Sequence, residues 1–326
     1  MEIRRVKYEE YRMLIDVMNE SFGFTTEEAK FEHILPKLYW PDNPTMVHIG
    51  AFEDGKLVSS IGIYPMELRN GDLRLRIACI GAVSTLPDHR GKGYFTAVME
   101  RVLSEARSMG FSLLFLGGNR VRYGRFGFEY GGRNFNVNIS KRTRALIDPG
   151  KFEVLPYDEN DAEVTARLLE IYNKKPMRVT RTAAEFGVTL RSWNSTVYYV
   201  KAGDDFGISG YFSLKGGNVT EIGYDCPLDT MFGAILSLLD SANLSLPMST
   251  YSPELLSKVD NYVVTHNHMF NILDESAVIR FLGADPARIL PTLPLDHRTR
   301  VRLILGDSAY DSVTGTNIFI SSANSG

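Results

Sequence analysis

Residues 90–93, Arg-Gly-Lys-Gly, place two cations and two glycines directly before a segment with helical periodicity. The first N–H groups of a helix have no intrahelical partner and carry partial positive charge, so they suit an anion. Glycine lets the backbone approach such a ligand closely, and Arg90 and Lys92 add charge. These residues predict a site for a pyrophosphate. The alternative that they leave open is a tight, solvated connection between a strand and a helix.

Two common nucleotide-binding motifs do not fit this turn. The dinucleotide fingerprint needs three spaced glycines soon after a first strand. Here the third glycine is absent, and the turn follows a strand in the middle of a domain. The phosphate loop needs Gly-Lys followed by Ser or Thr, but Gly93 is followed by Tyr94. The sequence therefore excludes both motifs and leaves the carrier of the pyrophosphate open.

The elements around the turn alternate between strands and helices. Apolar residues recur at helical spacing from Phe95 to Ala106, and Gly110 is a typical helix stop. Strands are expected over residues 2–6, 46–52, 56–64, 64–69, 73–83 and 111–116, a helix over 9–22, and one or two antiparallel strands over 126–139. Asp54-Gly55 and Asn70-Gly71 are typical hairpin turns. This order predicts an α/β (α+β) fold.

The second half of the chain reads as a weaker copy of the first. The segment from 152 to 173 repeats the strand-then-helix plan of residues 2–22, and the segment from 221 to 248 can be aligned with residues 79–115. The Arg-Gly-Lys-Gly turn is missing from this copy, so the chemistry is expected in the first copy. We expect units at 1–148, 149–267 and 268–326, the last with a helix at 275–282, a proline-rich connector at 286–294 and strands at 301–305 and 316–321.

The amino-acid composition limits the classes of function that we expect for this protein. The net charge of −3 over 326 residues gives no overall field for nucleic acid or an anionic membrane. No apolar run has the length of a membrane span, and the N-terminal residues show no signal peptide. The two cysteines, Cys79 and Cys226, lie in strand-like segments and are expected to be buried thiols. We expect a cytoplasmic protein without nucleic-acid or membrane partners.

With these elements in place, the chain resembles the GCN5-related N-acetyltransferases (GNAT). Their pattern, Arg/Gln-x-x-Gly-x-Gly/Ala opening a long helix after a strand, is matched from Arg90 onward except at its last position, Phe95. A bulky apolar residue there is similar to the enhanced-intracellular-survival branch. The segment YGRFGFE, residues 123–129, resembles the Tyr-x-x-x-Gly-Phe signature of the superfamily. The branch implies a catalytic domain at 1–148, a degenerate acetyltransferase-like domain at 149–267 and a short sterol-carrier-like unit at 268–326.

The resemblance implies a set of residues that bind acetyl-CoA. Val83, Ser84 and Thr85 correspond to the strand edge that pairs with the pantetheine arm. The residues implied for the pyrophosphate, chiefly through backbone N–H groups, are Arg90, Gly91, Lys92, Gly93, Tyr94, Phe95 and Thr96. Gly118 and Asn119 correspond to a further contact with the cosubstrate. Arginines 120, 122, 125 and 133 either meet phosphates or are solvated. No metal is expected.

Tyr123 falls on the general acid of the family by the same resemblance. Attack of a primary amine on the thioester expels CoA thiolate, which a nearby phenol can protonate. The general base stays open between the terminal carboxylate that the branch uses, Asp16 and Glu20 on the first helix, and a chain of waters. The acceptor also stays open among a polyamine, an aminoglycoside-like polycation and a lysine side chain.

Two other functions are compatible with the sequence. One is a non-catalytic module that binds acyl-CoA; the other is an enzyme that uses a longer acyl or an aminoacyl donor. Homo-oligomerisation is implied by the resemblance alone.

Overall fold

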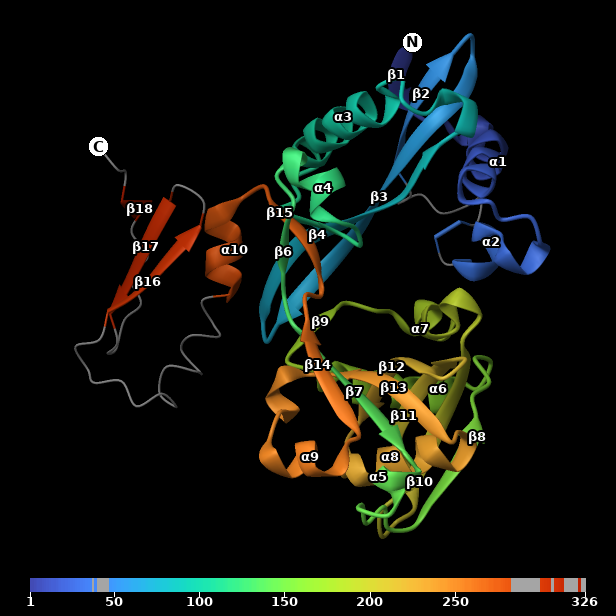
Figure 1. The fold of residues 1–326 in the computed structure, drawn as a ribbon, viewed down its shortest axis with the longest axis vertical. Coiled ribbons are helices and arrows are strands. Elements are labelled where there is room, and N and C mark those ends of the chain that lie inside the picture. The colour runs from blue at the N-terminus through green and yellow to red at the C-terminus, as the bar shows by residue number, and fades with distance from the viewer. Residues whose placement is uncertain (37, 40–46, 283–299, 306–307, 314–321, 324–326) are drawn as a thin grey trace.

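The computed structural model of the chain describes residues 1–36, 38–39, 47–282, 300–305, 308–313 and 322–323. Two large mixed sheets lie one above the other, and a small sheet lies to one side (Figure 1). The helices cover the faces of the large sheets. The expected α/β (α+β) fold class is confirmed.

The first sheet has the order β1-β2-β3-β4-β5-β15-β6, and β9 pairs with β3. Its strands are β1 Glu2–Arg5, β2 Val47–Glu53, β3 Lys56–Asn70, β4 Leu73–Thr85, β5 Leu113–Leu116, β6 Glu129–Gly131, β9 Met177–Val179 and β15 His268–Ile272. Helices α1 (Tyr11–Phe22) and α2 (Phe31–Ile34) pack on one face, and α3 (Tyr94–Ser108) packs on the other. The short helix α4 (Arg120–Tyr123) follows β5.

Helix α3 forms where the apolar spacing predicts it. Val98, Met99, Val102 and Ala106 are fully buried against the sheet. Gly110, with φ +73°, follows the end of the helix, in a conformation that suits glycine. The packing of this one apolar stripe fixes how the N-terminus of α3 is presented beside the end of β4.

The second sheet has the order β14-β7-β13-β12-β11-β10-β8. Its strands are β7 Asn134–Ser140, β8 Phe152–Pro156, β10 Thr196–Ala202, β11 Gly207–Lys215, β12 Asn218–Tyr224, β13 Ser241–Leu246 and β14 Asn261–Thr265. Its helices are α5 Lys141–Arg144, α6 Ala162–Asn173, α7 Ala183–Leu190, α8 Leu228–Leu238 and α9 Pro253–Lys258. The pairing β8-β10-β11-β12-β13 repeats β1-β2-β3-β4-β5, with the last pair parallel in both sheets.

The two large sheets contain strands from both sides of residues 148 and 267. Strand β7 belongs to the second sheet although it precedes residue 149, and β9 and β15 belong to the first sheet. Gly132, with φ +65°, lies between β6 and β7, where the chain passes from one sheet to the other. The return from β14 to β15 runs beside this crossing, because the Asn267 N–H donates to the Gly131 carbonyl at 3.1 Å. Residues 126–139 therefore contribute strands to both large sheets.

The segment after β15 begins with the expected helix, α10 (Glu275–Leu282). Val278 and Phe281 of α10 pack against Leu75 and Ile77 of β4, so the helix adds to the core of the first sheet. The small sheet consists of β16 Arg300–Leu305, β17 Ser308–Val313 and β18 Ser322–Ala323. The expected connector at 286–294 and strand at 316–321 lie outside the described residues.

In the described ranges, none of the helices combines the length and the apolar character needed to cross a lipid bilayer.

Candidate active site

The first sheet opens between β4 and β5. The two strands pair in parallel only where Ile77–Cys79 faces Leu113–Phe115. Beyond that point β4 continues to Thr85 without β5 beside it, so one edge of residues 80–85 is unpaired on this side. An unpaired strand edge offers N–H and C=O groups to an extended ligand.

Strand β4 also contains a bulge at this opening. The register with β3 shifts between the pairs Ser60↔Ser84 and Gly62↔Gly81. Ala82 lies in the bulge with φ +47°, a conformation that is strained for a residue other than glycine. Bulges redirect the residues that follow them, and Val83 lines the cleft described below. Alanine carries no sequence signal for this conformation, so sequence reasoning missed the bulge.

The N-terminus of α3 faces the same opening. Gly93 is the N-cap residue, and no side chain caps the helix. The first helical hydrogen bond runs from the Ala97 N–H to the Gly93 carbonyl at 3.1 Å, so the preceding N–H groups have no helical acceptor. Gly91 and Gly93 have φ of +75° and +85°, and a Cβ at either would contact nothing within 4 Å. The glycines are therefore required by the conformation of the turn, and the space beside them is open.

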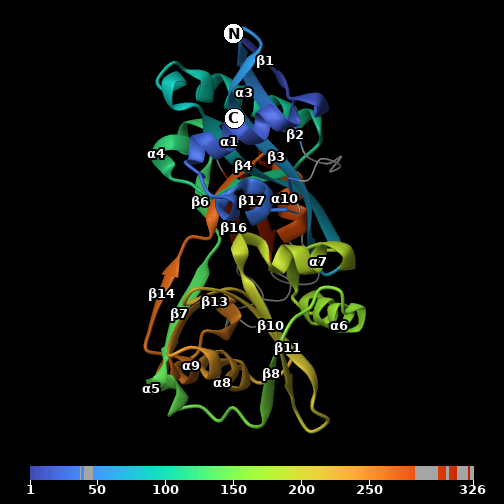
Figure 2. The same cartoon turned by 90° about the vertical axis from the view of Figure 1, so that its right-hand side faces the viewer.

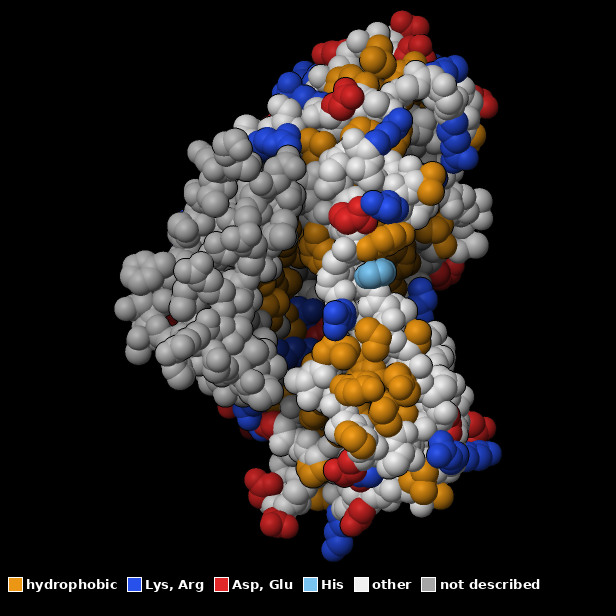
Figure 3. Space-filling model, turned by 60° about the vertical axis from the view of Figure 1, so that its left-hand side comes forward, with side chains coloured by type: hydrophobic (Ala, Val, Ile, Leu, Met, Phe, Trp, Pro, Cys, Tyr) orange, Lys and Arg blue, Asp and Glu red, His pale blue; other side chains and the backbone are white. Residues whose placement is uncertain are grey.

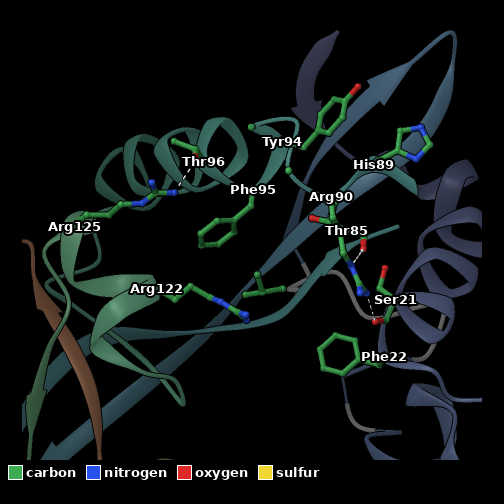
Figure 4. Close-up of a pocket in the computed structure, with 13 residues that line it drawn as sticks. Ser21, Phe22, Thr85, His89, Arg90, Tyr94, Phe95, Thr96, Arg122 and Arg125 are labelled. Carbon is green, nitrogen blue, oxygen red and sulfur yellow. Dashed lines mark hydrogen bonds between the residues drawn. The ribbon is translucent and has the colours of Figure 1, made fainter. Parts of the chain in front are cut away.

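A cleft of about 700 Å³ lies along this opening (Figure 4). Its lining residues are Ser21, Phe22, Val83, Thr85, His89, Arg90, Gly91, Gly93, Tyr94, Phe95, Thr96, Arg122 and Arg125. Eight of these lining residues are sequence-predicted, namely Val83, Thr85, Arg90, Gly91, Gly93, Tyr94, Phe95 and Thr96. The structure therefore brings both predicted segments, the strand edge and the turn, into one cleft.

The other predicted residues lie around this cleft. Asn119 lines an adjoining pocket of about 460 Å³, which shares Phe95, Arg122 and Arg125 with the cleft. Ser84 is buried, and its hydroxyl donates to the Ala82 carbonyl at 2.8 Å, within the bulge. Lys92, Gly118 and Tyr123 line neither pocket.

Arginine side chains give the cleft its positive charge. Arg90 donates to the carbonyls of Thr85 at 3.2 Å and Ser21 at 3.0 Å, so its guanidinium ties the turn to β4 and α1. Arg125 donates to the Thr96 hydroxyl at 2.6 Å, at the start of α3. The side chain of Arg122 points into the cleft (Figure 4). Arg122 and Arg125 flank the free N–H groups of α3 and suit an anion bound there.

Three lining residues carried no signal in the sequence. Ser21 and Phe22 end α1, which reads as an ordinary amphipathic helix. His89 precedes the turn, and its Nε2 lies 3.2 Å from a carboxylate oxygen of Glu53. These contacts join segments far apart in the chain, so local patterns did not reveal them.

Tyr123 is a fixed aromatic ring behind the cleft. Its side chain is 5% exposed, and its ring packs edge-on against Phe95 at 5.9 Å and Phe128 at 6.3 Å. A Cβ on Gly118 would come within 2.4 Å of the Tyr123 ring, so the ring lies directly on that glycine.

The structure does not bring the proposed bases into the cleft. Asp16 and Glu20 lie on the exposed face of α1, and Asp16 pairs with Arg12 at 3.5 Å. Neither carboxylate is among the residues that line the cleft. The terminal carboxylate of Gly326 lies outside the described residues.

A buried polar cluster lies under the bulge. The Tyr64 hydroxyl bonds to the Tyr39 hydroxyl and to His48 Nε2, the latter at 3.1 Å, and Nδ1 of His48 is buried without a partner among the described residues. The Tyr64 side chain covers Gly62 and Gly81, where a Cβ would come within 2.3 Å of its hydroxyl oxygen and 3.0 Å of its ring, respectively. Burial lowers the pKa of His48 to about 3, so this imidazole is neutral.

We expect this neutral histidine to make stability fall in acid. In the unfolded chain His48 takes up a proton below pH about 6.5, whereas in the folded protein its imidazole stays neutral down to pH about 3. The free energy of unfolding should therefore fall with pH across this window, by about 2 kcal/mol between pH 7 and 5. Urea unfolding at both pH values measures this loss. His48→Gln can keep a hydrogen bond to Tyr64 but does not titrate, so equal losses in both proteins would contradict the prediction.

Both cysteines are free thiols, but each is half-buried rather than fully buried as expected. Burial raises the pKa of Cys79 to about 12 and that of Cys226 to about 11. Neither thiol is therefore activated as a nucleophile at neutral pH.

Comparisons with known proteins relate part of the chain to a family. Residues 2–131 match the family model described as acetyltransferase (GNAT) domain. An uncharacterized N-acetyltransferase of Streptomyces avermitilis is 26% identical over 156 residues, which are 47% of this chain and 37% of that protein. The match thus spans well under half of the curated relative.

Solved structures resemble the chain over its whole length. A GCN5-related N-acetyltransferase from Kribbella flavida has a TM-score of 0.68 at 18% identity, covering 100% of this chain and 85% of that one. Eis1 from Mycobacterium abscessus has a TM-score of 0.66 at 16% identity, covering 100% and 86%. At these identities the comparison establishes a shared fold.

Proposed function

We propose that this chain, whose residues 2–131 carry an acetyltransferase (GNAT) domain, transfers an acetyl group from acetyl-CoA to a primary amine. The observation that carries the proposal is the uncapped N-terminus of α3 beside the unpaired edge of β4. An anion site and a strand edge in one cleft match a cosubstrate that joins a pyrophosphate to an extended amide chain.

The cosubstrate lies along the cleft in two parts. The N–H groups at Gly91–Thr96 hold the pyrophosphate, and Arg122 and Arg125 add charge to it. The pantetheine amides pair with the free edge at Val83–Thr85, as a further strand would. Gly118 and Asn119 border the opposite side of the opening, after β5 ends. Lys92 contributes charge from outside the cleft.

The reaction is a direct attack on the thioester. The amine nitrogen forms a bond to the acetyl carbon, and the bond from that carbon to sulfur breaks with its electron pair going to sulfur. Tyr123 donates its phenolic proton to the CoA thiolate and regains one from water. The proton lost by the amine passes to water. The strained bulge at Ala82 turns the backbone at Val83 toward the thioester, where an N–H can stabilise the developing oxyanion.

We further propose that catalysis belongs to residues 1–148 with the added strands β9 and β15. The repeated strand order in the second sheet supports a degenerate acetyltransferase-like unit at 149–267. No glycine-rich turn precedes α8, where Asp225, Cys226 and Pro227 stand instead. A sterol-carrier-like role for 268–326 rests on the resemblance of the sequence alone. No metal takes part in the proposed reaction.

The test measures release of CoA thiol from acetyl-CoA with a panel of amines. The panel holds a polyamine, an aminoglycoside and a lysine peptide, and binding of acetyl-CoA is measured separately by calorimetry. We expect binding, and release with at least one amine. Binding without release would favour the module that only binds acyl-CoA, and release only from a longer acyl-CoA would favour another donor. Absence of binding would contradict the assignment of the cleft.

A further inference from the structure

One carboxylate lies beside the residues at both ends of the glycine-rich turn, Arg90–Gly93. Glu53 ends β2, directly before the hairpin turn to β3. His89 is the last residue before the glycine-rich turn, and its Nε2 lies 3.2 Å from a carboxylate oxygen of Glu53. Tyr94 is the first residue of α3; burial, and next the Glu53 carboxylate beside it, raise the pKa of its phenol. The rings of His89 and Tyr94 lie 5.9 Å apart.

Glu53 reaches the cleft only through these two neighbours. It is not among the residues that line the cleft, whereas His89 and Tyr94 are. In Figure 4 the side chains of His89 and Tyr94 point away from Phe95 and Arg122. Strand β2 and helix α3 pack together at the upper end of the molecule, beside the N-terminus (Figure 2). Nδ1 of His89 has no hydrogen-bond partner among the described residues, so Glu53 supplies the polar contact that orients this ring.

The turn needs such support, because its own backbone holds it weakly. Among the described residues, the N–H groups of residues 91–93 make no backbone hydrogen bond, and Gly91 and Gly93 both have positive φ. Glycine has the greatest backbone freedom, so ordering this segment around a ligand would cost affinity. The Arg90 guanidinium ties the start of the turn to β4 and α1. The Glu53 carboxylate joins its two ends.

The overall charge of the chain does not substitute for this local order. The net charge is −3, and on the coloured part of the face in Figure 3 the Lys and Arg side chains are interspersed with Asp and Glu side chains. No broad positive field of that face therefore draws a pyrophosphate to the turn. The affinity depends on how the free N–H groups converge with Arg122 and Arg125.

We propose that Glu53 is a positioning residue for the cosubstrate, which holds the turn through His89 and Tyr94 in the conformation that binds the pyrophosphate. This role of Glu53 rests on the proposed function. The sign of its charge makes the role testable, because a carboxylate near an anion site repels the ligand. A benefit of Glu53 to binding can come only from geometry, that is, from a turn that is ordered before the ligand arrives.

The test compares Glu53→Ala with wild type by calorimetry with acetyl-CoA. We expect the Kd to rise about tenfold, as for the loss of one hydrogen bond to a charged group. Glu53→Gln keeps an oxygen that can accept from His89 and Tyr94, so its Kd should rise less than about threefold. Asp54→Asn is the matched control: it removes the same charge from the next residue, and asparagine tolerates its φ of +48°. This control should not weaken binding.

A donor without a pyrophosphate separates the turn from the rest of the cleft. S-acetylpantetheine carries the thioester and the amides alone. With the amine that supports CoA release, kcat/KM for acetyl-CoA should fall about tenfold in Glu53→Ala while kcat stays unchanged. The kcat/KM for S-acetylpantetheine should be equal in both proteins. Circular dichroism melting confirms that each variant is folded.

The outcomes distinguish this role from the proposed function. If Glu53→Ala binds acetyl-CoA as tightly as wild type, or more tightly as the loss of a negative charge alone would cause, the role of Glu53 is wrong and the proposed function stands. Equal losses with both donors would show damage to the whole cleft and would also overturn the role. A wild type that binds no acetyl-CoA overturns the proposed function, and the role of Glu53 with it.

Discussion

Tyr123→Phe should lower kcat for acetyl transfer at least about tenfold and leave the affinity for acetyl-CoA unchanged. The phenolic hydroxyl is the one group lost, and it supplies the proton for the departing thiolate in the proposed reaction. The ring itself should stay in place, since it is held by Phe95, Phe128 and the backbone at Gly118. Steady-state release of CoA thiol gives kcat, and calorimetry with acetyl-CoA gives the affinity.

A second tyrosine provides the matched control. Tyr130 follows α4 by seven residues, is 40% exposed and accepts a long hydrogen bond from the Arg120 N–H at 3.4 Å. Tyr130→Phe should leave kcat within about twofold, because no step needs that hydroxyl. Full activity in Tyr123→Phe would remove the general acid from the mechanism. A loss confined to KM would instead assign Tyr123 to binding.

The parts of the site that local sequence could predict are those built from a continuous segment. The turn at Arg90–Gly93 and helix α3 depend on glycine conformations and on one apolar stripe, and both appear in the sequence. Helix α10 was predicted at its observed bounds. The hairpin turns at Asp54-Gly55 and Asn70-Gly71 likewise connect β2 to β3 and β3 to β4. Each of these features is decided by neighbours within a few residues.

The remaining parts depend on contacts across the chain. The bulge at Ala82 arises where β4 must pair with β3 and yet leave β5, and alanine gives no sign of a left-handed conformation. The cluster of Tyr39, His48 and Tyr64 unites three segments in one buried network. The exchange of β7 and β15 between sheets follows from pairing partners that no local pattern specifies. Tyr123 was identified by resemblance alone. Its position behind the cleft depends on how its ring packs against other segments.

That packing can be tested without removing any functional atom. In Gly118→Ala the new Cβ would lie 2.4 Å from Cε2 and 2.5 Å from Cδ2 of Tyr123, so a buried ring must move. Overpacking of this kind costs about 1–3 kcal/mol of stability, and it displaces the proposed acid. We expect a lower melting temperature and a fall in kcat. Gly117→Ala is the matched control, since a Cβ there meets nothing within 4 Å and should change neither quantity.

Combining the substitutions separates displacement of the hydroxyl from general damage to the site. If Gly118→Ala acts on kcat through the position of the Tyr123 hydroxyl, it should lower kcat much less in a Tyr123→Phe background than in wild type. Its cost in stability should persist there, because the phenylalanine ring occupies the same space. Substitutions at residues in contact have non-additive effects, whereas the effects of substitutions at independent sites add. Equal losses of kcat in both backgrounds would show that Gly118 shapes the cleft independently of the phenol.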